Sequence, residues 1–145
     1  MASAEKIHIR IMKSMNQNIT FNRKYFLSAV VLFIIEVLIA LYVRDSFIRP
    51  YFGDFLVVIL IYCFLKSFWN EKVLIVGMLT LLFSFAIEIG QYFNLVKLLG
   101  LEHSELARVV IGTGFAWGDM LAYTLGIVFV FVCEKFIFHK SLSKK

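Results

Sequence analysis

Long runs of apolar residues, each interrupted by few polar positions, divide this chain into four parts. They cover about residues 25–42, 54–68, 73–93 and 118–138. A helix needs about 20 mostly apolar residues to cross the hydrocarbon core of a membrane, whereas an open sheet would leave backbone groups unpaired in lipid. The pattern therefore predicts an all-α, polytopic membrane protein with four transmembrane helices, the second of which is short.

The segment between the third and fourth runs has an apolar pattern of its own. Ser104 is suited to cap a short helix that continues to about Ile111 and ends at the glycine-containing segment 112–114. Small polar residues at the N-cap and glycine after the C-terminus are typical helix boundaries. Its apolar side would consist of Leu106, Val109 and Val110. We expect this interfacial helix to lie on or dip into the outer membrane surface.

Composition narrows the class of protein further. Of the 145 residues 61% are hydrophobic, with 16 phenylalanines and one proline, and the mean hydropathy of +0.84 exceeds that of typical soluble domains. The length suits one transmembrane domain over residues 25–138, with basic tails at 1–24 and 139–145. No separate soluble domain fits in what remains.

Lysine and arginine residues are distributed unevenly along the predicted topology. Eleven fall in the N-terminal tail, in the turn after the second span and at the C-terminus, while only Arg44, Arg49, Lys97 and Arg108 fall on the opposite side. Because the cytoplasmic side of a membrane protein carries the excess of basic residues, we expect both termini in the cytoplasm. The pI of about 9.3 then follows from topology, and no nucleic-acid partner is predicted.

Four acidic residues lie within or at the ends of the predicted helices. In the inferred orientation Glu36, Asp54, Glu88 and Asp119 fall in the outer half of the membrane, and the inner half is expected to carry only flanking basic residues. A charged side chain near the bilayer centre costs about 2.5–3.5 kcal/mol, so such residues usually face a bundle interior or a cavity. The acids therefore mark where function is expected.

Each acid also has a purely structural interpretation. Asp54 and Asp119 follow glycine at the predicted start of a helix, where a carboxylate can cap free backbone donors. Glu36 and Glu88 lie inside spans, where hydrogen bonding to a neighbouring helix would account for them. The sequence leaves both interpretations open.

The spacing of polar residues places several of them on shared helix faces. Glu88 and Gln91 are three residues apart, and Asp119, Tyr123 and Gly126 are separated by steps of four and three. Two polar stripes would thus descend from the outer surface and meet in one pocket, with basic residues nearby to neutralise the acids or bind phosphate. The candidate ligand-binding residues are Glu36, Arg49, Asp54, Glu88, Gln91, Arg108, Asp119 and Tyr123.

Several other chemistries lack the residues they need. Cys63 and Cys133 lie inside spans, and the three histidines are scattered, so no metal site is predicted. Ser84 lies one turn from Glu88 without a histidine beside it, which leaves no nucleophile and base pair. The chain has no glycine-rich phosphate loop or dinucleotide motif, so no cofactor is expected.

The polar motifs resemble a known group of bacterial membrane proteins. Ile87-Glu88-Ile89-Gly90-Gln91, followed by Gly112-Thr113-Gly114-Phe115 and by Gly118-Asp119-Met120-Leu121-Ala122-Tyr123, is similar to the VanZ-like superfamily. The chain resembles the domain-of-unknown-function family DUF2809 more closely, to which Arg49-Pro50-Tyr51-Phe52-Gly53-Asp54 is also similar. The resemblance implies a multi-pass protein of the bacterial inner or plasma membrane and brings no established reaction.

This chain also departs from the VanZ pattern at three positions. VanZ-type proteins commonly carry arginine, an acid and asparagine where Thr113, Ala116 and Tyr123 stand here. The glycopeptide-resistance role of VanZ is therefore not carried over to this chain.

Several functional hypotheses follow from the predicted pocket. The first is a binding protein, surrounded by membrane lipids, whose ligand is an envelope lipid, a saccharide or a small amphiphile. The second is a membrane-embedded enzyme in which Glu88 or Asp119 acts as acid or base. A proton-coupled transporter, which would act as a homodimer if it resembles small multidrug-resistance proteins, and an assembly subunit are further alternatives.

Overall fold

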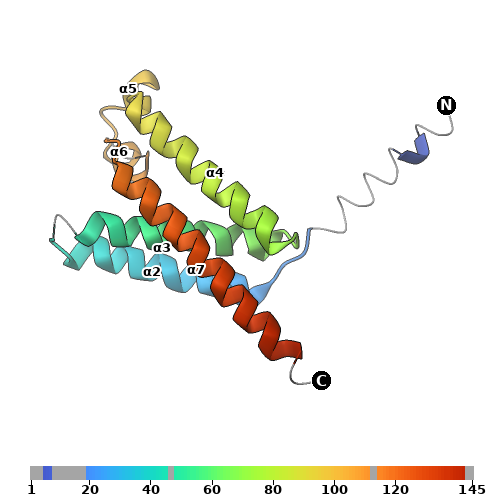
Figure 1. Ribbon diagram of the computed structural model, residues 1–145. Helices are drawn as coiled ribbons and strands as arrows, with labels where there is room; N and C mark the ends of the chain where they lie inside the picture. The colour runs from blue at the N-terminus through green and yellow to red at the C-terminus, as the bar shows by residue number, and fades with distance from the viewer. Residues whose placement is uncertain (1–4, 8–18, 46–47, 112–113, 143–145) are drawn as a thin grey trace.

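The computed structural model describes residues 5–7, 19–45, 48–111 and 114–142. The elements of this part are helices, apart from an isolated antiparallel bridge between Ile19 and Trp69. Three of them are long and apolar enough to cross a membrane, which confirms the all-α class and indicates a multi-pass membrane protein. The helices are α2 (Arg23–Tyr42), α3 (Ile48–Phe68), α4 (Val73–Tyr92), α5 (Leu95–Leu98), α6 (Glu105–Ile111) and α7 (Trp117–Leu142) (Figure 1).

Most helix boundaries agree with those predicted from the sequence. The side chain of Asn22 caps α2 by accepting a hydrogen bond from the Lys24 amide at 3.1 Å. The hydroxyl of Ser104 accepts one from the Ala107 amide at 3.3 Å, which confirms the predicted short helix α6. Residues 8–18 of the predicted basic tail, residues 112–113 at the predicted end of α6, and the side chains of Val109 and Val110 lie outside what the structure describes.

Helix α3 begins earlier than predicted. It starts at Ile48, so Asp54 lies in its second turn. The predictions that the second helix is short and that it opens at Asp54 are wrong, and the capping interpretation of Asp54 does not hold. The glycine before Asp54 had indicated the start of the helix, but α3 contains Gly53 and also Pro50. Proline is tolerated in the first turn of a helix because its missing N–H has no partner there. The carboxylate of Asp54 is therefore free of a capping role in α3.

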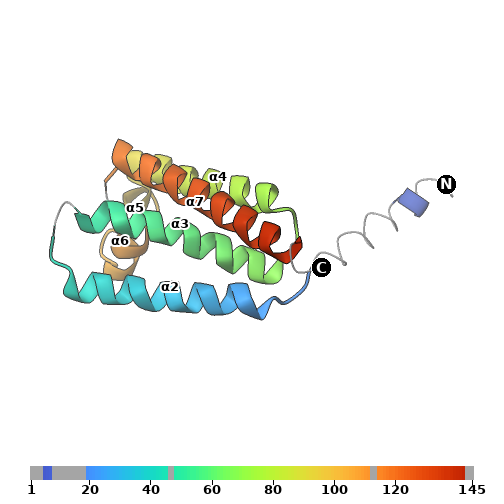
Figure 2. The same cartoon turned by 60° about the horizontal axis from the view of Figure 1, so that its bottom comes forward.

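The long helices pack in a defined order. Helix α3 lies between α2 and α7 and contacts both extensively, while α4 packs mainly on α7 and to a smaller extent on α3. Helix α2 begins and α7 ends at one end of the bundle, and α5 and α6 lie at the opposite end (Figures 1 and 2). We refer to the end with α5 and α6 as the loop end.

The contact between α3 and α7 depends on a close backbone approach. A Cβ atom at Gly126 would lie 2.3 Å from Cγ1 of Val58 and 2.8 Å from the carbonyl oxygen of Phe55. Val58 and Ile127 are almost completely buried beside it. Small residues that allow such approaches are typical of helix packing in membranes. In α2, by contrast, the buried residue is Ala29, so most of this helix faces outward.

A polar cluster at the other end of the bundle was not predicted. The hydroxyls of Tyr25 in α2 and Tyr62 in α3 both donate to Oε1 of Glu134 in α7, at 2.5 and 3.0 Å. The prediction that the inner half carries only flanking basic residues is therefore wrong. Because α7 continues to Leu142, Glu134 lies well inside the helix rather than at its end.

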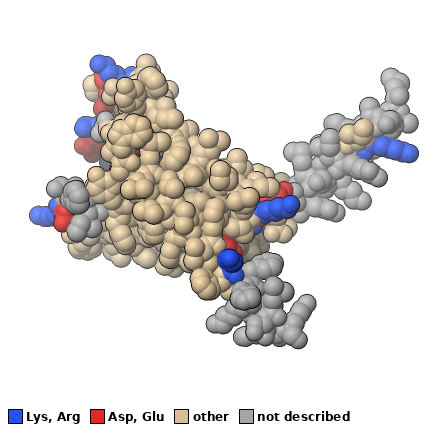
Figure 3. Space-filling view, in the orientation of Figure 1, with Lys and Arg blue, Asp and Glu red and all other residues tan. Residues whose placement is uncertain are grey.

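Charged residues and apolar residues are separated on the surface. On the face drawn in Figure 3, lysine, arginine, aspartate and glutamate gather at the two ends of the bundle, and a broad band without them lies between. Large exposed apolar side chains such as Phe33, Leu82 and Leu125 are 50% exposed or more. This separation agrees with the candidate spans.

Candidate functional site

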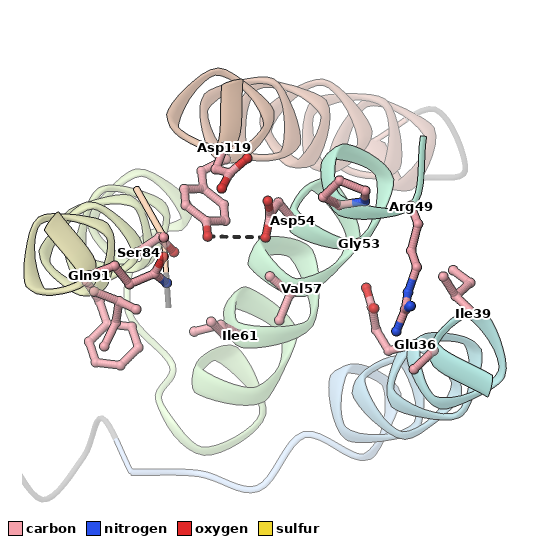
Figure 4. A pocket seen from close by; sticks show the side chains of 16 residues that line it. Glu36, Ile39, Arg49, Gly53, Asp54, Val57, Ile61, Ser84, Gln91 and Asp119 are labelled. Carbon is pink, nitrogen blue, oxygen red and sulfur yellow. Dashed lines mark hydrogen bonds between the residues drawn. The ribbon is translucent and has the colours of Figure 1, made fainter. Parts of the chain in front are cut away.

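A cavity lies among the four long helices, toward the loop end. It has a volume of about 590 Å³, and residues of α2, α3, α4 and α7 line it together with Gly114 (Figure 4). Cavities of about 300–1,000 Å³ are typical of sites for small molecules. The volume therefore suits a ligand of that size.

The lining changes from polar to apolar with depth. Arg49 in the first turn of α3, Gln91 in the last turn of α4 and Asp119 in the first turn of α7 surround the loop end of the cavity. Val57 and Ile61 line it further along α3. The cavity is thus amphipathic along the direction in which the candidate spans run.

Two carboxyl groups lie close together in the lining of the cavity, within hydrogen-bonding reach of each other. The side chains of Asp54 and Asp119 point toward one another (Figure 4), and the hydroxyl of Tyr123 donates to Oδ1 of Asp54 at 3.2 Å. Asp54 is held by α3, whereas Asp119 and Tyr123 stand one turn apart on α7. The contact between α3 and α7 therefore sets the separation of this pair.

Glu36 brings a third carboxylate to the cavity from α2. Its Oε2 lies 3.6 Å from the position that a Cβ atom would take at Gly53, so the acid rests against a part of α3 that has no side chain. Its Oε1 is buried and has no hydrogen-bond partner among the described residues. Figure 4 shows the side chain of Arg49 reaching toward this carboxylate.

Helix α4 carries a buried polar stripe beside the cavity. Thr80, Ser84 and Glu88 follow at intervals of four residues and are 0%, 4% and 0% exposed, and of these Ser84 lines the cavity. The hydroxyl of Thr80 donates to the carbonyl of Val76 at 2.8 Å. The Oγ of Ser84 has no partner within the described part of the chain. Unpartnered buried polar atoms are rare in folded proteins and call for an explanation.

Glu88 lies behind the cavity wall. Its Oε1 accepts a hydrogen bond from the backbone amide of Ala116 at 2.7 Å, and its Oε2 is buried without a partner in the described ranges. The hydrogen bond ties α4 to the segment that leads into α7, three residues before Asp119. Glu88 thus positions the loop rather than lining the site.

The structure brings together most of the residues that the sequence suggested. Of the eight candidates, Glu88 lies behind the wall and Arg108 is exposed on α6 away from the cavity. The six that line it are Glu36, Arg49, Asp54, Gln91, Asp119 and Tyr123. Ser84 was missed, although its spacing of four residues from Glu88 was the signal that places both on one face.

The site offers more hydrogen-bond acceptors than donors. Three carboxylates line the cavity against one guanidinium group, and the Tyr123 hydroxyl is already used by Asp54. Within the described ranges, no group of three or more histidine, cysteine, aspartate and glutamate residues has the arrangement of a metal site. The arrangement can receive donor groups of a ligand or exchange a proton between paired carboxyls.

Comparison with known families adds one finding. The model of the family described as protein of unknown function (DUF2809) matches residues 43–127, more than half of the chain. The chain belongs to the DUF2809 family. No solved structure matches it. The wider relation to the VanZ-like superfamily stays a prediction.

In this DUF2809 protein the matched region contains most of the cavity. It includes α3, α4 and the first part of α7, and hence Asp54, Ser84, Asp119 and Tyr123. The remaining lining residues, Glu36, Ile39 and Ala40, all belong to α2. The unmatched N-terminal helix therefore completes the wall of a site that the matched region mostly builds.

Proposed function

We propose that this DUF2809 protein resides in the inner or plasma membrane of bacteria and binds an envelope amphiphile in the cavity at its loop end. The polar group of the ligand contacts the carboxylates, and its apolar part lies along Val57 and Ile61. The observation that carries this proposal is the pair of unpartnered buried atoms at the cavity, Oε1 of Glu36 and Oγ of Ser84.

The same proposal includes a fourth span and an orientation. With 26 residues, α7 extends about 39 Å, more than the roughly 30 Å hydrocarbon core requires. The C-terminal end of α7 and the beginning of α2 lie at the same end of the bundle (Figure 1). An even number of spans requires this, because it places both termini on one side of the membrane. The excess of basic residues at that end favours the cytoplasm, so the loop end and the cavity face outward. There α6, with Leu106 78% exposed, rests on the membrane surface.

Aromatic residues at both ends support the same placement. At the loop end the ring of Phe115 contacts those of Tyr92 and Trp117, and at the opposite end the rings of Phe21 and Phe68 contact each other. Tryptophan and tyrosine are enriched where membrane helices pass through the headgroup region, which fits Tyr92 and Trp117 at the loop end and Trp69 at the opposite end. The band between them corresponds to the hydrocarbon core.

A ligand from the lipid phase can reach the cavity sideways. Helix α2 packs on α3 rather than extensively on α4, although residues of both α2 and α4 line the cavity. Ala40 of α2 stands at this side, and lipid chains surround it in the proposed arrangement. An amphiphile can therefore enter with its chain in the membrane and its polar group toward Glu36.

Identification of co-purified molecules tests the proposal. Wild type is extracted with its membrane lipids, and bound molecules are identified by native mass spectrometry. Ala40→Phe places a ring in the cavity and is expected to abolish recovery of the ligand. Leu41→Phe, at a position that is 66% exposed and does not line the cavity, is the matched control. Equal recovery from wild type and both variants would contradict the proposal.

The facing carboxyls of Asp54 and Asp119 favour a second candidate function. Two carboxyls at one site can act as a general acid and a general base on a bound molecule. In this case Asp119→Asn retains the ligand but stops its conversion. The assay follows membrane lipids by mass spectrometry after incubation with protein in vesicles. Unchanged lipids with wild-type protein would exclude the enzyme and leave the binding protein.

A further inference from the structure

We propose, on the basis of the amphiphile-binding function above, that the polar group of the ligand is a primary ammonium. It would lie among the carboxylates of Glu36, Asp54 and Asp119. These three acids come from three different helices and meet at one cavity. The inference concerns the chemical class of the headgroup, which the size and shape of the cavity alone do not specify.

The unpartnered atoms of the site indicate that the ligand supplies hydrogen-bond donors. An ionised carboxylate only accepts hydrogen bonds, and Oε1 of Glu36 is buried without a donor among the described residues. Ser84 is 4% exposed, and its hydroxyl at the cavity is equally without a partner there. A primary ammonium carries three donors that point in different directions, so one group can serve several acceptors at once.

The charges at the site indicate that the ligand also carries a positive charge. The carboxyls of Asp54 and Asp119 point toward each other (Figure 4) within hydrogen-bonding reach. When both are ionised, two like charges at this range in a low-dielectric site repel strongly. Arg49 is the cationic residue in the lining, and it extends toward Glu36 rather than toward this pair. A cation between the two aspartates would remove the repulsion, whereas a phosphate or sulfate would increase it.

Other headgroups meet only one of these two requirements. A quaternary ammonium carries the charge but has no N–H to donate, and a neutral sugar or alcohol donates without compensating charge. An anionic headgroup would add negative charge beside the carboxylates. The primary ammonium supplies both, and its alkyl chain would continue along Val57, Ile61 and Phe83 in the apolar part of the cavity.

A series of amphiphiles with one common chain separates these possibilities. The probes are dodecylammonium, dodecyltrimethylammonium, dodecanol and dodecyl sulfate, added at neutral pH to protein in phosphatidylcholine nanodiscs. Binding is measured by isothermal titration calorimetry, and protein-free nanodiscs correct for partitioning into lipid. We expect dodecylammonium to bind about tenfold more tightly than each of the others, the factor expected for hydrogen bonds to charged groups.

Variants of the acceptors test whether the preference arises at the cavity. Glu36→Gln removes one charge and is expected to reduce dodecylammonium binding about tenfold. Glu105→Gln, an exposed residue of α6 that does not line the cavity, is the control for the change in net charge and should leave binding unchanged. If Glu36→Gln does not fold, Ser84→Ala takes its place, because it removes an acceptor without changing charge.

The possible outcomes distinguish this inference from the function it rests on. Equal affinity for all four probes, abolished by Ala40→Phe, would overturn the ammonium preference while amphiphile binding stands. Tighter binding of dodecyl sulfate would overturn the preference in the same way. Absence of binding above protein-free nanodiscs for every probe would overturn both.

Discussion

Glu88 shows at the residue scale how a buried carboxylate can serve structure beside a site. Its Oε1 accepts from the Ala116 amide at 2.7 Å, and the side chain is 0% exposed. Glu88→Ala removes this acceptor and leaves a cavity, so we expect a loss of about 3 kcal/mol in the free energy of unfolding. Glu88→Gln keeps a carbonyl acceptor and should cost about 1 kcal/mol. Titration with SDS in mixed micelles measures both, and equal losses would contradict the anchoring role.

For Ser84 we expect a substitution to have the opposite effect on the stability of the ligand-free protein. Its Oγ is buried without a partner among the described residues, so Ser84→Ala removes an unsatisfied hydroxyl and should stabilise the ligand-free protein by about 1 kcal/mol. The same change should weaken ligand binding. Ser28→Ala, which removes a hydroxyl bonded to the Lys24 carbonyl on exposed α2, is the control. A loss of stability in Ser84→Ala would indicate a partner within the protein.

Residue types in the sequence predicted much of the candidate site but not the role of each member. Carboxylates inside or at the ends of apolar runs indicated Glu36, Asp54 and Asp119, because charges in a membrane are costly. The sequence did not separate Glu88 from the lining residues, since this depends on the path of the loop at Ala116. Ser84 was considered only as a nucleophile and not as a lining residue, because a serine in a membrane helix carries no charge whose burial is costly.

At the scale of elements, the packing of α7 on α3 depends on Gly126. A methyl group there would lie 2.3 Å from Cγ1 of Val58 and 2.8 Å from a backbone oxygen. We expect Gly126→Ala to lower the free energy of unfolding by about 1–3 kcal/mol, because the helices must move apart. Gly114→Ala is the matched control, since no atom lies within 4 Å of its Cβ position. SDS titration measures both, and equal stability of the two variants would show that the helix contact adapts freely.

The cluster at Glu134 joins three helices at the end opposite the cavity. Tyr25 of α2 donates to the same oxygen as Tyr62 of α3, and α2 otherwise packs mainly on α3. A double-mutant cycle with Tyr25→Phe and Glu134→Gln should give a coupling of about 1–2 kcal/mol. Tyr42→Phe, 77% exposed at the other end of α2, should show no coupling to Glu134→Gln. A zero coupling for Tyr25 would contradict the cluster's stabilising role.

Helix boundaries were predictable where local signals agreed and not where they conflicted. Ser104 is a strong N-cap residue and predicted the start of α6 correctly. Asn22, which caps α2, was not used to predict the start of that helix. The apolar run and the glycine before Asp54 predicted a late start for α3, although the helix begins at Ile48 and contains both Pro50 and Gly53. The predicted span 118–138 already contained Glu134, but the apolar run alone did not show its partners, because Tyr25 and Tyr62 come from other helices.

At the scale of the whole molecule, the proposed orientation predicts which loops meet the outside of the cell. Cys63 and Cys133 are first replaced by serine. A single cysteine is then introduced at one of two exposed positions, by Glu102→Cys near α6 or by Asn70→Cys between α3 and α4. A membrane-impermeant maleimide should label the first variant in intact cells and the second only after permeabilisation. The reverse pattern would invert the topology and place the cavity toward the cytoplasm.

The dependence of α2 on α3 also bears on how the chain enters the membrane. Glu36 rests against Gly53 of the following helix, while the other carboxylates of the cavity come from α3 and α7. If α2 left the translocon alone, lipid would surround Glu36, at a cost of about 2.5–3.5 kcal/mol near the bilayer centre. Release of α2 and α3 together as a hairpin avoids this cost. The site would then be completed only when α7, synthesised last, brings Asp119 and Tyr123 to the assembled pair.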